Sequence, residues 1–222
     1  MNAFIQFAGL LAALALPAAA PGADIPLYPS GPAQDSAFVR FVNAGSGPLQ
    51  VQAAGGAALT LPADAPASRF LPVAAGRPIS GTLALGGRHT PVSVTVRPGE
   101  FATVLALPAA GANATAVIKE SPDDFNAMRA SLALYNADPG CAPAGLRSAG
   151  RSVEIFAGVA AGQARRRPIN PVALTVEITC GGKAQGTQLE LGALAAGQRY
   201  SVFAVPGPGG TRALFAVDAL AR

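Results

Sequence analysis

Several residue types that carry chemistry in other proteins are scarce in this chain of 222 residues. Tryptophan is absent, there is one histidine, there are two cysteines, and only 13% of the residues are charged. A structural zinc site needs about four nitrogen or sulfur ligands at close spacing, so one histidine and two distant cysteines argue against such a site. Beyond the N-terminus, no apolar run approaches the roughly 20 residues that span a bilayer.

The residues that are abundant indicate a folded protein. Hydrophobic residues make up 50% of the chain, which is too high for a disordered protein because burial of these side chains can offset the entropy lost on folding. The 26 glycines and 20 prolines do not follow the three-residue period of collagen, so a fibre is excluded. The length suits one large domain or two small ones.

Residues 1–23 are predicted to be a secretory signal peptide. An apolar stretch from Phe7 to Leu16 leads into the small residues Ala18 to Ala20, which is the form of a cleaved export signal; a buried helix is the alternative. Export predicts a periplasmic protein with a disulfide between Cys141 and Cys180, because oxidising compartments favour disulfides. Two unpaired structural thiols are the alternative.

The mature part of the chain predicts an all-β fold of two small antiparallel β-sandwiches in tandem. Alternating or β-branched segments bounded by glycine and proline are typical of half-buried strands. Nine segments meet this description: residues 36–44, 80–85, 91–97, 101–107, 113–118, 129–137, 172–179, 188–191 and 199–205. We expect an N-terminal domain over residues 24–118, a polar linker over 119–127 and a C-terminal domain over 128–222.

The two domains show signs of an internal duplication. Phe41-Val42-Asn43-Ala44 aligns with Leu134-Tyr135-Asn136-Ala137, and the turn and strand at residues 98–108 align with residues 196–206. The offsets are similar in the two matches. The alternative is that two unrelated β domains share the same pattern of turns and strands.

Positive charge is concentrated in the second half of the chain. From residue 125 onward there are ten basic and five acidic residues, and a basic surface attracts polyanions. We therefore take Arg165, Arg166, Arg167 and Lys183 as candidates for contact with an acidic partner protein or an anionic polysaccharide. Nucleic acid is a poor partner for an exported protein, and a solvated loop with a chance run of arginines is the alternative.

The sequence offers little that could catalyse a reaction. His89 is the only histidine, within Gly86-Gly87-Arg88-His89-Thr90, a segment expected to form a hairpin turn. The sequence has no Gly-x-Ser-x-Gly motif of the kind that holds the serine nucleophile in hydrolases. We predict a hairpin turn, and not a phosphate-binding loop, for the segment Gly207-Pro208-Gly209-Gly210. We predict no catalytic residue, no metal and no cofactor. A weaker alternative is an esterase or acetyl carrier that uses His89 with Ser36 or Ser80.

Three ordered blocks resemble the AlgF family of periplasmic accessory proteins for alginate O-acetylation. The first is Leu27-Tyr28-Pro29 with the strand at residues 36–44. The second is Glu120-Ser121-Pro122 with residues 130–136, and the third is Ile169-Asn170-Pro171-Val172. The high alanine and glycine content, the scarcity of lysine and the cysteine pair depart from the pattern expected of that family.

The resemblance implies a two-domain β protein without catalytic machinery of its own. Its implied partners are a membrane-bound O-acyltransferase and periplasmic SGNH-type acetyltransferases, which carry the nucleophiles. The predicted function is that of an exported adaptor in exopolysaccharide O-acetylation and biofilm formation, with a sheet face or edge of the first domain docking partner proteins. The alternative is a stand-alone carbohydrate-binding or surface-adhesion module.

Overall fold

The computed structural model describes residues 36–108, 114–121, 126–151 and 153–221. These residues form sixteen strands and no helix, which confirms the all-β prediction. No helix long and apolar enough to cross a membrane occurs among them. The expected signal peptide lies outside the described residues.

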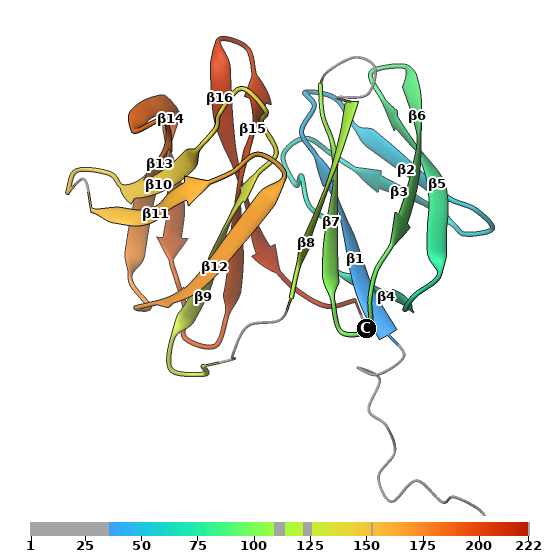
Figure 1. Cartoon of the computed structure of the whole chain (residues 1–222), viewed down its shortest axis with the longest axis horizontal. Helices are drawn as coiled ribbons and strands as arrows, with labels where there is room; N and C mark the ends of the chain where they lie inside the picture. The colour runs from blue at the N-terminus through green and yellow to red at the C-terminus, as the bar shows by residue number, and fades with distance from the viewer. Residues whose placement is uncertain (1–35, 109–113, 122–125, 152, 222) are drawn as a thin grey trace, which may run out of the picture. The chain divides into compact units, whose positions relative to one another are not determined.

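The first eight strands form a sandwich of two four-stranded sheets (Figure 1). One sheet has the order β4-β1-β7-β8 and the other β3-β2-β5-β6. We call this unit the N-terminal sandwich. Its strands are β1 (Ser36–Asn43), β2 (Leu49–Ala53), β3 (Ala58–Leu61), β4 (Leu71–Ala74), β5 (Pro78–Leu85), β6 (Arg88–Thr95), β7 (Phe101–Ala106) and β8 (Thr115–Glu120).

The last eight strands repeat this plan as the C-terminal sandwich. Its sheets have the orders β12-β9-β15-β16 and β11-β10-β13-β14, so each strand takes the place of the strand eight positions earlier. This identity of topology agrees with an internal duplication. The strands are β9 (Ala130–Asn136), β10 (Ala144–Ser148), β11 (Glu154–Val159), β12 (Gln163–Ile169), β13 (Ala173–Cys180), β14 (Lys183–Ala193), β15 (Arg199–Gly207) and β16 (Gly210–Asp218).

Strand pairing is antiparallel with the exception of one pair in each sandwich. β1 runs parallel to β7, and β9 runs parallel to β15. The expectation of purely antiparallel sandwiches is therefore corrected at these two central pairs. A parallel pair needs a long crossover connection, and here the strands of the second sheet lie along the chain between the two partners.

Two asparagines at equivalent positions fix the same corner in both sandwiches. Asn43 ends β1 and donates through its amide to the carbonyls of Gly47 and Leu61, at 2.8 and 3.0 Å. Asn136 ends β9 and donates to the carbonyls of Cys141 and Val159, at 2.5 and 3.0 Å. Both side-chain oxygens accept the backbone N–H two residues ahead. Burial makes these bonds costly to lose, so the repeated Asn-Ala in the sequence has a structural cause.

The hydrophobic core has three parts. One fills each sandwich, between its two sheets. The third lies between the sandwiches and joins the sheet of β1 and β7 to the sheet of β9 and β15. We call these two sheets the inner sheets and the others, β3-β2-β5-β6 and β11-β10-β13-β14, the outer sheets. Val42 and Leu105 meet Tyr135 and Phe203 in the third part, and all four are fully buried.

The described residues of both sandwiches belong to one compact unit. β8 continues through Glu120, two residues into the segment expected as a linker. After β16 the chain returns to the N-terminal sandwich. There the backbone N–H of Phe70 donates to the carbonyl of Ala219 at 2.8 Å. The two halves are thus joined by apolar side chains and by backbone hydrogen bonds.

All nine predicted segments overlap observed strands, and seven strands were not predicted. Four of the seven, β3, β4, β10 and β12, are short or rich in alanine, glycine, proline and arginine, residues that carry little strand signal of their own. The hairpin turn predicted at residues 207–210 is confirmed between β15 and β16.

Candidate functional site

A buried cluster of charged side chains lies between the two inner sheets. Arg40 of β1 is only 1% exposed and donates to Asp218 Oδ1 of β16 at 2.5 Å. Its other nitrogens donate to Thr103 Oγ1 of β7 and Ser201 Oγ of β15, each at 2.9 Å. A buried guanidinium is tolerated when its charge and its N–H groups find partners. The side chain at the centre of the N-terminal sandwich's inner sheet is thus tied to two strands of the other sandwich.

Three aromatic rings surround the same guanidinium. The Arg40 carbon Cζ lies 4.4 Å from the ring centroid of Phe70, 4.9 Å from Phe203 and 5.1 Å from Tyr135. Cation–π attraction at such distances strengthens as water is excluded. The cation is therefore held by rings from both sandwiches, which favours a fixed contact over a hinge.

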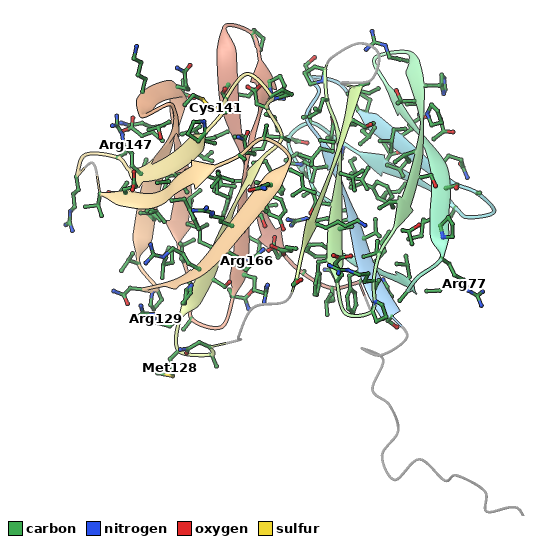
Figure 2. The ribbon with its side chains drawn as sticks, viewed as in Figure 1. Arg77, Met128, Arg129, Cys141, Arg147 and Arg166 are labelled. Carbon is green, nitrogen blue, oxygen red and sulfur yellow. A yellow bond between two sulfur atoms is a disulfide. The ribbon has the colours of Figure 1, made fainter. Side chains whose placement is uncertain are left out.

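Arg166 belongs to this cluster and not to the surface, which corrects the expectation for one of the predicted contact residues. Its side chain is 5% exposed, and its Nη2 lies 3.1 Å from Glu120 Oε1 and 2.8 Å from Asp218 Oδ2. Figure 2 shows Arg166 on β12. Successive strand residues point to opposite faces. Arg166 lies opposite Ala133 and faces the N-terminal sandwich, whereas Arg165 and Arg167 lie opposite Leu134 and Leu132, on the face turned toward the outer sheet.

The pKa values of Asp218 and Arg166 are shifted by the opposite charges beside them. Burial opposes ionisation of Asp218, but the charges of Arg40 and Arg166 and the hydrogen bond from Ser201 outweigh it and lower the pKa of the Asp218 carboxyl. Burial would lower the pKa of the Arg166 guanidinium, and Glu120 and Asp218 reverse that effect and raise it. The cluster is thus two cations and two anions that stabilise one another's charged forms.

Tyr135 is the unsatisfied member of this interface. Its side chain is fully buried, and its hydroxyl has no hydrogen-bond partner among the described residues. Burial raises the pKa of Tyr135 to about 12. An unpaired buried hydroxyl costs stability, so Tyr135 contributes to the interface through its ring, which packs against Phe203 and Arg40.

Arg165 and Arg167 form an exposed pair at the junction of two edge strands. They donate from β12 to the carbonyls of Ala157 and Ile155 on β11, at 3.0 and 3.1 Å. A shallow hollow of about 410 Å³ lies beside them, with Glu154 among its lining residues. We call this region the arginine edge. Each guanidinium has five N–H donors, so one bond to the backbone leaves further donors facing solvent.

Lys183 lies far from the arginine edge. It begins β14 and pairs with Cys180 of β13. β14 and β11 are the opposite edges of one four-stranded sheet, so three strand spacings, about 14 Å, separate the two edges. The four predicted contact residues therefore do not form one patch. Arg147, another basic residue of this half, is engaged with Glu177 at 2.6 Å.

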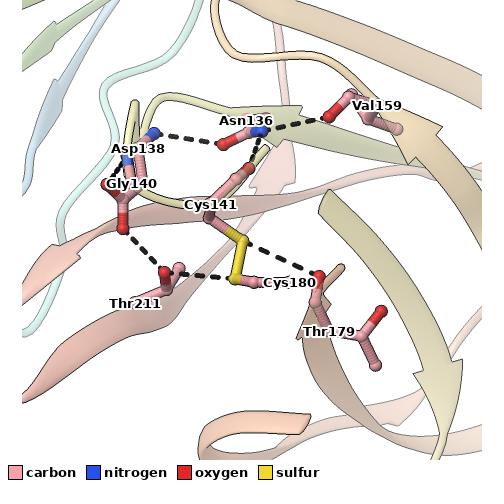
Figure 3. Close-up of a disulfide and its surroundings, with 8 residues drawn as sticks. All are labelled: Asn136, Asp138, Gly140, Cys141, Val159, Thr179, Cys180 and Thr211. Carbon is pink, nitrogen blue, oxygen red and sulfur yellow. Dashed lines mark hydrogen bonds between the residues drawn. A yellow bond between two sulfur atoms is a disulfide. The ribbon is translucent and has the colours of Figure 1, made fainter. Parts of the chain in front are cut away.

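The predicted disulfide between Cys141 and Cys180 is present (Figure 3). It joins the loop before β10 to the end of β13, with the two Cα atoms 4.9 Å apart. Cys180 Sγ lies 3.3 Å from Thr211 Oγ1 of β16, and Thr211 donates to Asp138 Oδ2 at 2.7 Å. The disulfide and this polar chain connect the two sheets of the C-terminal sandwich at one end.

His89 does not form a catalytic group with Ser36 or Ser80. It is exposed on β6, where it pairs with Ala84, while Ser80 pairs with Ser93 four residues further along. Four residues of strand span about 13 Å. Ser36 lies in the other sheet. Within the described residues there is also no group of three or more histidine, cysteine, aspartate or glutamate side chains that could hold a metal ion.

Comparison with known proteins gives only distant likenesses. No family model and no curated protein matches the chain. The C-terminal domain of AlgF from P. aeruginosa is similar over 40% of this chain and 98% of that domain, at 17% identity and a TM-score of 0.33. A carbohydrate-binding module from Eubacterium rectale, solved with maltoheptaose, covers 84% of this chain and 98% of its own length, at 11% identity and a TM-score of 0.27.

A protein proposed to act in cell adhesion, from Bacteroides uniformis, is similar over 84% of this chain and 99% of its own length, at 10% identity and a TM-score of 0.29. At these TM-scores we infer no function from any of the three.

Proposed function

We propose that this protein is an exported, periplasmic, non-catalytic adaptor in the O-acetylation of an exopolysaccharide, alginate or a similar polymer. In this role it binds a periplasmic SGNH-type acetyltransferase and a membrane-bound O-acyltransferase, which perform the chemistry. The observation that carries the proposal is the ordered resemblance of three sequence blocks to the AlgF family. Residues 36–43 and 130–136 of those blocks are β1 and β9, equivalent central strands of the two inner sheets.

The geometry supports an adaptor in two further respects. His89, the one histidine of the chain, lies about 13 Å along the sheet from Ser80 and in a different sheet from Ser36, so it serves neither serine as a base. The buried cluster of Arg40, Asp218, Arg166 and Glu120 holds the sandwiches in one arrangement. A protein with two fixed sandwiches presents its surfaces at constant separation, which suits the positioning of two partners.

The arginine edge is the surface that we assign to an acidic partner or to the polymer. Its guanidinium groups are exposed at one side of the C-terminal sandwich, and contacts of this kind weaken as salt screens them. Arg165→Ser with Arg167→Ser should weaken binding and reduce its salt dependence without unfolding the protein. Arg166 is left intact in this variant because its removal would take away the cation that pairs with Glu120, while Asp218 would keep Arg40.

The role is tested by the acetyl content of the secreted polymer, measured by NMR in a strain with the gene deleted in frame. We expect polymer at normal yield without acetyl groups. When the deletion strain is complemented with a variant gene, His89→Ala should restore acetylation of the polymer fully. The variant with Arg165→Ser and Arg167→Ser should restore it in part. Arg151→Ser with Lys183→Ser removes two cations elsewhere and is the matched control, with full restoration expected. Normal acetylation in the deletion strain would contradict the role and favour the stand-alone binding or adhesion module.

A further inference from the structure

The outward face of the N-terminal sandwich's outer sheet is polar and carries no Asp, Glu, Lys or Arg. The outward positions of β2, β3, β5 and β6 hold five hydroxyl side chains, two glutamines and His89, together with alanine and proline. The intervening residues Leu49, Val51, Leu83 and Val94 are buried on the other side. We call this surface the polar face, and its four strands are described without a gap.

The strand register makes these side chains one continuous surface. Gln50 is paired with Thr60 on one side and Ala84 on the other. Gln52 is likewise paired with Thr82, and Ser80 with Ser93, whose hydroxyls lie 3.3 Å apart. Neighbouring strands lie about 4.8 Å apart and alternate residues about 6.7 Å apart. The face therefore brings together hydroxyl and amide groups that donate and accept hydrogen bonds. The Gln52 amide also donates to the carbonyls of Ala53 and Gly56 in its own hairpin.

The equivalent surface of the C-terminal sandwich is different. There Arg147 lies between Glu154 and Glu177 in neighbouring strands, and Glu190 is paired with Thr175. The same fold in the same chain thus carries charged side chains, including the Arg147–Glu177 ion pair, on one outward face and none at the outward positions of the other. The strand topology is identical in both halves, so it does not dictate the absence of charge on the polar face.

We infer that the polar face binds a neutral, polyhydroxylated polymer, which is a neutral polysaccharide chain. An anionic polymer is recognised through Lys and Arg, and the outward positions hold none. The basic residues beside the face lie at its margins: Arg77 and Arg88 at strand ends, and Lys119 of β8, which donates to the backbone carbonyl of Thr95. A protein interface is enriched in Tyr, Trp, Phe, Met and Arg, and the face has none of these either. Sugar hydroxyls match side-chain hydroxyls and amides, and no charged group must be stripped of water.

This inference does not depend on the acetylation role, because binding is measured on the purified protein. Full-length protein labelled with nitrogen-15 is titrated with cellopentaose, a neutral oligosaccharide, and separately with an oligomannuronate of the same length. Only cellopentaose should shift the amide signals of β2, β3, β5 and β6, with a Kd of about 1 mM because no aromatic ring contributes stacking. The Kd should not change with salt, since neither partner is charged there.

A matched pair of variants locates the site. Gln50→Ala with Ser93→Ala removes one amide and one hydroxyl from the polar face and should raise the Kd about fivefold to tenfold. Thr175→Ala with Gln188→Ala removes the same groups from the C-terminal sandwich and should leave the Kd unchanged. The inference is overturned if cellopentaose shifts no signal of the polar face, or if the first variant binds like the wild type. The inference is also overturned if oligomannuronate shifts the signals of the polar face as much as cellopentaose does. Shifts that depend on protein concentration in the absence of sugar overturn it as well, because they indicate that a second copy of the chain occupies the face.

Discussion

Asp218→Asn removes one charge from the buried cluster while keeping the size of the side chain. In the wild type, Asp218 accepts from Arg40 at 2.5 Å and from Arg166 at 2.8 Å, and its side chain is 4% exposed. The variant leaves two buried guanidinium groups with Glu120 as the one remaining acid of the cluster. Loss of one member of a buried ion pair costs about 3–5 kcal/mol. We expect a loss of stability in this range.

The pH dependence gives the prediction a second, independent readout. The pKa of Asp218 is lowered in the folded protein, so its charge stabilises the fold above the unfolded-state pKa of about 3.9. That contribution is lost as the pH falls through the lowered pKa of the folded state. The difference in stability between the wild type and Asp218→Asn should therefore be full at neutral pH and shrink in acid.

The assay is urea unfolding followed by circular dichroism and by tyrosine fluorescence. Because the cluster and the third core join the two sandwiches, both probes should report one transition in the wild type. Glu177→Gln is the matched control, since it neutralises the acid of the more exposed Arg147–Glu177 pair and should cost less than about 1 kcal/mol. A loss below about 1 kcal/mol for Asp218→Asn would refute the structural role of the cluster.

Two further predictions concern the interface and the disulfide. Tyr135→Phe removes a buried hydroxyl that has no partner among the described residues, so the free energy of unfolding should stay the same or rise by up to about 1 kcal/mol; a loss above 1 kcal/mol in urea unfolding would show that the hydroxyl is satisfied. Cys141→Ala with Cys180→Ala opens a loop between residues 39 positions apart and should lower stability by about 3–4 kcal/mol. The oxidised wild type should be lighter by two hydrogens than the reduced protein in mass spectrometry, and equal masses would contradict the disulfide.

Strands could be predicted from the sequence where their own residues combine strand propensity with an alternating hydrophobic pattern. The alternating valines of β6 and the β-branched run of β13 combine strand propensity with burial on one face, and both are local properties. β12 lacks that signal because its residues are mostly arginine, alanine and proline. It is a strand because it pairs with β9 along seven residues, and pairing between distant segments leaves no local pattern.

The arginine run shows the same limit at the level of the site. Three consecutive arginines suggest one basic patch if the backbone is a loop. In a strand they alternate, so Arg166 is buried against Glu120 and Asp218 while Arg165 and Arg167 reach β11. The burial of Arg40 could not be predicted from the residues around it in the sequence. Its partners Thr103, Ser201 and Asp218 are 63 to 178 positions away.

The sequence by itself determined the all-β class and the pairing of the two cysteines, and it indicated the duplication with which the shared strand topology agrees. Each of these follows from composition or from patterns within a few residues, which local physics controls. Tertiary structure alone decided the parallel pairs at the sheet centres, the buried ion cluster and the contrast between the two outer faces. These features depend on which distant strands meet and in which register, and a shift of one residue would turn every side chain to the other face.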